Sequence, residues 1–159
     1  MKENKQNVFI FANGDVQSPS CHGGLPYYFF KAGERAGVFH TGFRFKVHFY
    51  AFLRAIWNLY RIMTFRRKGG FQYSSFFLKF AHSFLHDHPK SGIVISFNQV
   101  LPINKLCNAQ FESIPYIDAT LKDLVDNPSY GVSVPKDIEK KVLKIEKEYY
   151  QSCKLIVTR

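Results

Sequence analysis

Two glycines and a histidine stand together in CHGGLP, residues 21–26, between an apolar run and an aromatic-rich segment. Because Pro26 suits the first turn of a helix, we expect His22, Gly23 and Gly24 just before a helix start. Free backbone N–H groups and the helix dipole favour an anion there, and glycines let a diphosphate approach the backbone. The three residues are therefore candidate substrate contacts. A tight turn between a strand and a helix is the alternative interpretation.

One carboxylate, Asp118, follows the apolar stretch IPYI and precedes Ala-Thr. A carboxylate at the carboxyl end of a strand can orient an acceptor hydroxyl or take its proton. Asp118 is therefore the candidate catalytic residue, and Thr120 is a candidate substrate contact beside it. The alternative is structural, an Asx turn or a helix cap over 119–122, because Asp before Thr-Leu-Lys is also a good N-terminal signal.

The histidines do not predict a metal site. His82 and His86 lie one helical turn apart, close to Asp87 and His88, but no Glu follows His82 as in an HExxH motif. The polar end of a helix is the better interpretation, so we predict neither a metal nor a cofactor. The three cysteines form no CxxC pair and are expected to be reduced thiols without a chemical role: Cys21, Cys107 and Cys153.

Most of the net charge of +10 lies in one segment, since residues 31–90 hold eleven Lys and Arg against two acids. Such a cationic field attracts anionic lipid, nucleic acid or phosphorylated substrates. Basic and aromatic residues are mixed over 44–68, which predicts a helix that contacts an anionic membrane surface. A core-facing helix with a solvated basic edge is the alternative. Nucleic acid is not expected, because no RNP-like motif is present. The candidate contacts are Arg54, Arg61, Arg66, Arg67 and Lys68.

Strand-like and helix-like segments alternate along the chain and must position these residues. The expected strands are 8–15 with its turn, 38–49, 91–97, 114–119 and the final KLIVTR. The expected helices are 25–36, 50–68, 73–87 and 136–151, and a helix or a helical turn is expected over 102–112. This alternation predicts an α/β class, a Rossmann-like domain whose mainly parallel sheet is flanked by helices.

Ligands of such sheets bind beyond the carboxyl ends of the strands. This rule selects the loops 13–24, 96–102, 118–123 and 158–159. It adds Ser96 and Gln99 to the candidate substrate contacts.

The length of 159 residues predicts a single domain. The polar start MKENKQN does not look like a secretory leader, and no run of about 18 uncharged apolar residues predicts a spanning helix. We expect a cytoplasmic protein that is peripheral at the inner face of the membrane. Because the last segment is an apolar strand, we also expect a further domain that is missing from this chain.

The ordered segments FANGD, HGGLPYYFFKAGERAG, IVISFNQVLP, IPYIDATL and EKKVLKIEKEYYQSCKLIVTR resemble the amino-terminal half of GT-B glycosyltransferases, in particular the retaining family 4 enzymes. The resemblance implies that residues 1–159 bind a hydroxyl acceptor, while a missing carboxy-terminal domain holds the nucleotide-sugar donor. It places Asp118 on the acceptor side and the glycine loop at the cleft between the domains. The alternative is a non-catalytic α/β module that binds an anionic ligand or a membrane.

Overall fold

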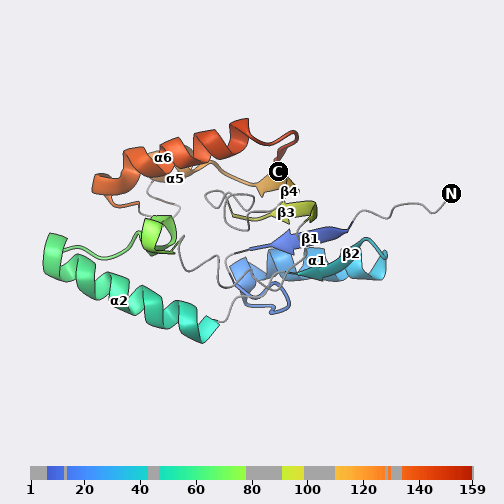
Figure 1. Cartoon of the computed structure of the whole chain (residues 1–159), viewed down its shortest axis with the longest axis horizontal. Coiled ribbons are helices and arrows are strands. Elements are labelled where there is room, and N and C mark those ends of the chain that lie inside the picture. Colours follow the sequence, from blue (N-terminus) through green and yellow to red (C-terminus); the bar gives the residue numbers. More distant parts are fainter. Residues whose placement is uncertain are drawn as a thin grey trace.

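The sheet at the centre of the molecule has five strands, all parallel, in the order β2-β1-β3-β4-β5 (Figure 1). The computed structural model describes residues 7–12, 14–42, 47–77, 91–98, 110–127, 129 and 134–158. The strands are β1 (Val8–Phe11), β2 (Phe39–Gly42), β3 (Ser91–Ser96), β4 (Gln110–Ile117) and β5 (Val157–Thr158). The helices are η1 (Cys21–Gly24), α1 (Leu25–Arg35), α2 (Val47–Phe65), η2 (Phe71–Tyr73), α5 (Leu121–Asp126) and α6 (Lys136–Gln151). The predicted α/β class with a parallel sheet is confirmed.

Strand β1 lies inside the sheet, and its sequence is uniformly apolar. Phe9, Ile10 and Phe11 are each at most 2% exposed, and Phe9 lies opposite Val94 of β3. A strand buried on both faces reads as a continuous apolar run rather than an alternating one. The sequence VFIF therefore suits a position between β2 and β3.

The chain reverses its direction across the sheet at β1. It runs from β1 outward to β2 and then crosses back to place β3 on the other side of β1. In doubly wound sheets, ligands bind beyond the strand ends at such a switch point. The topology therefore predicts that a ligand binds at the loops that follow β1 and β3.

Helices α1 and α6 cover opposite faces of the sheet. Phe29 of α1 contacts Tyr116 of β4, with ring centroids 6.0 Å apart, whereas Tyr149 of α6 shares a hydrogen bond with Ser113 of the same strand. Ser113 and Tyr116 are three residues apart, so their side chains point to opposite faces. The two faces are therefore covered by helices from opposite ends of the sequence.

Several predicted bounds change in the structure. Strand β2 ends at Gly42, and α2 already begins at Val47, within the segment predicted as a strand over 38–49. Residues 110–112 belong to β4, and the rest of the range 102–112, where a helix or a helical turn is predicted, lies outside the described residues. Most of the helix predicted over 73–87 lies outside the described residues, whereas α6 has the predicted bounds.

Candidate functional site

The candidate site is the carboxyl edge of the sheet. Because the strands are parallel, the loops after β1, β3 and β4 leave the sheet at the same edge. The start of α1 also lies there, since Phe29 in its second turn contacts Phe97, which directly follows β3, at a centroid distance of 5.6 Å. The glycine loop and Asp118 are therefore on the same edge of the sheet, as predicted.

Gly24 is required by the local structure. It caps α1 with a left-handed φ of 89°, and it is buried. A Cβ there would lie 3.1 Å from the Tyr28 ring and 3.2 Å from the Pro19 carbonyl oxygen. This supports the tight-turn interpretation for Gly24, and a bulky residue at this position would strain the fold.

Gly23 is the glycine that a ligand can approach. It has a φ of 67°, its backbone is exposed, and a Cβ there would meet nothing within 4 Å. The side chain of His22, the third candidate of this loop, lies outside the described part of the structure.

Cys21 anchors the glycine loop and has no reactive thiolate. Its side chain is 6% exposed and packs in a cluster with Ile10 and Phe30. Burial, together with the nearby Asp15, raises the pKa of the thiol to about 11. Cys153 is half-buried, and burial also raises the pKa of its thiol. Cys107 lies outside the described residues.

Asp118 is exposed and does not cap the next helix. Thr120 is the N-cap of α5: its hydroxyl accepts a hydrogen bond from the Asp123 amide at 3.1 Å. It also donates to the Asp123 carboxylate at 2.6 Å, which lowers the pKa of that carboxyl. The capping interpretation of Asp118 is therefore wrong. The hydroxyl of Thr120 already serves the cap, so it is a poorer substrate contact than predicted.

Ser96 has a structural role in the turn after β3. Its side chain is fully buried. The hydroxyl donates to the Asn98 carbonyl oxygen at 3.0 Å and accepts from the Asn98 amide at 3.2 Å. Ser96 is therefore not available as the predicted substrate contact. Gln99, predicted beside it, lies outside the described residues.

Three aromatic side chains join the loops of this edge and were missed in the sequence. Phe29, Phe97 and Tyr116 are half-buried, and the rings of Phe97 and Tyr116 lie 5.0 Å apart. Aromatic rings of this kind line ligand sites because they offer apolar area with little loss of side-chain entropy. The signal for them was the position of Phe97 and Tyr116 at the ends of two adjacent strands.

A buried carboxyl group, Glu146 of α6, fixes the loop that carries Asp118. Its Oε1 atom accepts hydrogen bonds from the Leu121 amide at 2.7 Å and from the Tyr150 hydroxyl at 2.9 Å. Burial raises the pKa of Glu146. The sequence carried a signal for it, because Glu146 lies among the apolar positions of α6, one turn after Val142.

Arg61 is not a surface cation. It is 2% exposed and forms a two-pronged ion pair with Asp137 at the start of α6, with N–O distances of 2.5 and 3.0 Å. Its predicted role as a membrane or anion contact is therefore wrong, since it links α2 to α6 inside the protein. Four of the five predicted cationic contacts remain exposed: Arg54, Arg66, Arg67 and Lys68.

No known protein family, no curated protein and no solved structure matches this chain. Within the part of the chain that the structure describes, no helix combines the length and the hydrophobicity needed to cross a bilayer. The resemblance to sugar transferases thus remains a prediction from the sequence.

Proposed function

We propose that this chain is the acceptor-side domain of an enzyme that moves a sugar from a nucleotide-sugar to a hydroxyl acceptor. One observation carries the proposal: exposed Gly23, after β1, and exposed Asp118, after β4, lie on the same edge of the sheet, which also holds the switch point between β1 and β3. The half-buried rings of Phe29, Phe97 and Tyr116 join the same loops. A nucleotide-sugar and a hydroxyl acceptor require an exposed backbone that an anion can approach, an exposed carboxylate and aromatic rings that are partly exposed, and all three are found here.

Asp118 acts on the acceptor in this proposal. Its carboxylate orients the acceptor hydroxyl and takes its proton. The hydroxyl oxygen then bonds to the anomeric carbon, and the bond from that carbon to the diphosphate oxygen breaks, with the electron pair leaving on the nucleotide. Glu146 supports this step indirectly, because its hydrogen bond to the Leu121 amide holds the loop in place.

The donor belongs mostly to a second domain, as the resemblance implies. In this chain, the exposed backbone at Gly23 and the first turn of α1 face the diphosphate, because the free N–H groups of a helix start favour negative charge. The proposal therefore gives this chain a weak donor contact and the main acceptor contact.

A non-catalytic module that binds an anion is the second candidate. The roles of Ser96 and Thr120 favour it, because both hydroxyls are occupied within the protein and leave few side chains for a specific acceptor. In this case Gly23 matters for binding and Asp118 does not.

Two matched pairs of variants separate the candidates. Gly23 and Gly37 share a φ of 67° and open space around the Cβ position, but Gly37 follows α1 at the opposite edge of the sheet. Gly23→Ala and Gly37→Ala should therefore lower the free energy of unfolding by the same amount, because each places alanine in the same left-handed backbone conformation. Asp118→Asn is paired with Asp126→Asn, which removes an exposed carboxylate from the end of α5.

The assay titrates the full chain with a nucleoside diphosphate, its sugar derivative and an octyl glycoside, followed by amide shifts in NMR spectra. We expect Gly23→Ala to weaken diphosphate binding. Asp118→Asn should weaken octyl glycoside binding about tenfold, because the binding free energy of one hydrogen bond to a charged group is lost. The controls should bind like the parent chain. Diphosphate binding with no octyl glycoside binding would support the second candidate, and no binding of any probe would refute both.

A further inference from the structure

Helix α2 carries large apolar side chains on its inner and outer sides, and the polar residues Arg54, Asn58 and Arg61 lie away from the outer side. Its inner side packs Tyr50, Leu53 and Trp57 against η2 and the following residues. Four large apolar side chains on its outer side are 43–78% exposed: Phe52, Ile56, Leu59 and Met63. Their spacing of three and four residues places them in one stripe along the helix. A large exposed apolar patch on a globular domain normally marks a surface that contacts a partner or a membrane.

The outer side of α2 carries no charge. Arg54 and Arg61 are the two charged residues between Val47 and Phe65. Arg61 is buried against α6, and Arg54 lies beside the ring of Tyr50 on the inner half of the helix. In Figure 1 the side of α2 turned away from η2 faces no other described element. The stripe is therefore a continuous apolar surface open to solvent.

The helix is held so that this surface stays outward. The ion pair between Arg61 and Asp137 fixes α2 to α6. The Trp57 indole donates to the Gly69 carbonyl oxygen at 2.9 Å, and the Gly69 amide donates to the Asn58 side chain at 3.0 Å. These contacts prevent α2 from turning its stripe toward the core.

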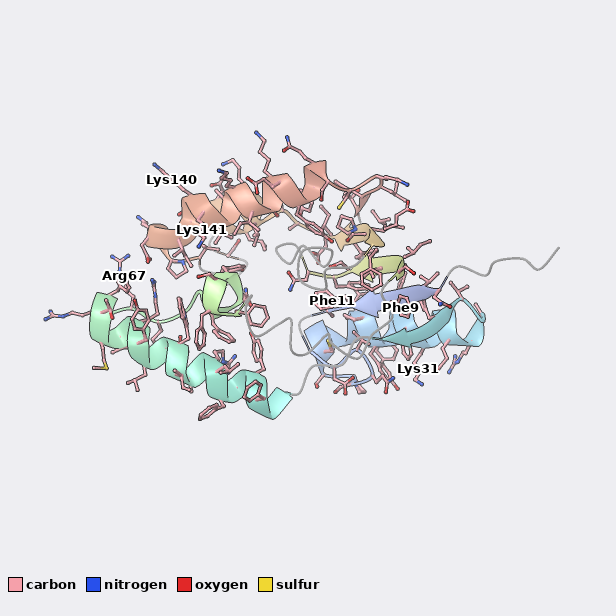
Figure 2. All side chains as sticks on the ribbon, in the orientation of Figure 1. Phe9, Phe11, Lys31, Arg67, Lys140 and Lys141 are labelled. Atoms are coloured by element: carbon pink, nitrogen blue, oxygen red, sulfur yellow. The ribbon has the colours of Figure 1, made fainter. Side chains whose placement is uncertain are left out.

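The same hydrogen bonds position a cluster of cations at the end of the stripe. Arg66, Arg67 and Lys68 follow α2 directly and are all exposed. Arg66 has a left-handed φ of 53°, which turns the chain sharply toward the anchored Gly69. Figure 2 shows Arg67 at the end of α2 that lies farthest from the sheet. The three cations thus follow the stripe at the end of α2, and Arg67 is near enough to Asp137 of α6 to contribute to the lowered pKa of that carboxyl.

We propose that the outer side of α2 docks into the interface of an anionic membrane. The stripe enters the boundary between headgroups and acyl chains, and Arg66, Arg67 and Lys68 contact lipid phosphates. Interfacial helices combine these two contributions, apolar area and attraction to anionic lipid. Because the inner side of α2 is fixed to the domain, the helix lies along the surface.

A second copy of this chain fits the surface less well. The sequence is basic on both flanks of α2, with Arg44 and Lys46 before it and residues 66–68 after it, and no acid occurs between Glu34 and Asp87. Parallel or antiparallel pairing of two copies would therefore bring cations close to cations. An anionic lipid surface complements both flanks. This inference does not depend on sugar transfer or on any ligand at the sheet edge.

The test measures co-sedimentation of the full chain with vesicles of phosphatidylcholine, with and without phosphatidylserine. We expect binding that requires phosphatidylserine and weakens with salt. Leu59→Glu should weaken it at least tenfold, because an apolar contact is replaced by a charge. Leu155→Glu is the matched control, since Leu59 and Leu155 are 60% and 54% exposed. Circular dichroism should show both variants folded.

The cations are tested by charge-matched double variants. Arg67→Gln with Lys68→Gln should weaken binding about 30-fold, because each basic residue near such a surface contributes about a factor of five. Lys147→Gln with Lys154→Gln removes the same charge elsewhere and should have a much smaller effect. Equal binding to both kinds of vesicle, or equal loss in both double variants, would refute the proposal. A dimer in light scattering that Leu59→Glu dissociates, without vesicle binding, would show that a second copy covers α2.

Discussion

The ion pair between Arg61 and Asp137 should be a main determinant of how firmly α2 is attached. Asp137→Asn removes the charge that faces a guanidinium with 2% exposure, while the Asp137 side chain is 33% exposed. An exposed ion pair contributes about 0–1 kcal/mol to stability, and breaking a buried pair costs about 3–5 kcal/mol. The geometry lies between these cases, so we expect a loss of ~2 kcal/mol in the free energy of unfolding.

Urea unfolding of the full chain at pH 7 measures this loss, and it corresponds to a fall of ~4–8 °C in Tm. Glu139→Gln is the matched control, because Glu139 is the other acidic residue in the first turn of α6. It reports the helix-dipole part of the effect, about 0.3–1 kcal/mol. Adding Arg61→Met to Asp137→Asn should recover most of the lost stability, since an apolar side chain needs no counter-charge.

The effect should also depend on pH. Arg61 lowers the pKa of Asp137 in the folded chain. The ion pair therefore stabilises the fold above the ordinary Asp pKa of about 3.9, and this contribution is lost as the pH falls through the lower folded-state value. The difference between parent and Asp137→Asn should shrink in that acidic range. Equal stability of Asp137→Asn and Glu139→Gln at pH 7 would refute the reasoning.

Three further substitutions and one labelling experiment test the structure around the candidate site. Thr120→Ala should cost ~1 kcal/mol in urea unfolding, because the α5 cap is lost, and an unchanged midpoint would contradict the capping geometry. Gly24→Ala should destabilise more than Gly23→Ala: both pay ~1–2 kcal/mol for a left-handed residue, but only the first also meets a crowded Cβ position. Glu146→Gln should make the free energy of unfolding less dependent on pH above about 4.5. Burial raises the pKa of Glu146 in the folded chain, so the parent chain loses stability as the pH rises from the ordinary Glu value toward the raised one. An unchanged pH profile would argue against a buried carboxyl. Cys21, with a pKa of about 11, should resist iodoacetamide at pH 8 until the chain unfolds, as mass spectrometry can follow.

The sequence predicted the fold class well because buried parallel strands leave a strong local signal. VFIF in β1 and IVI within β3 are continuous apolar runs, and the apolar periodicity of α6 marks the helix that covers one face of the sheet. The short strand β2 gave no comparable signal. Its sequence FHTG ends only five residues before α2, so strand-like composition continued into the helix.

The sheet edge that carries Gly23 and Asp118 was predicted, but the roles of individual side chains were not. Parallel topology alone brought Gly23 and Asp118 to one edge. The roles of individual hydroxyls depend on which backbone amide lies within reach, as for Ser96 with Asn98, and no spacing in the sequence encodes that. Arg61 was misassigned for the same reason, because its partner Asp137 is 76 residues away.

The pairing of β1 with β3 has a consequence for synthesis of the chain. Val8 leaves the ribosome 85 residues before its partner Ile93. At a translation rate of about 5–20 residues per second, the apolar VFIF segment stays unpaired on its β3 side for roughly 4–17 s. During this delay we expect chaperones that bind exposed strands to hold the segment. Depletion of such chaperones should therefore increase the aggregated fraction of the newly made protein.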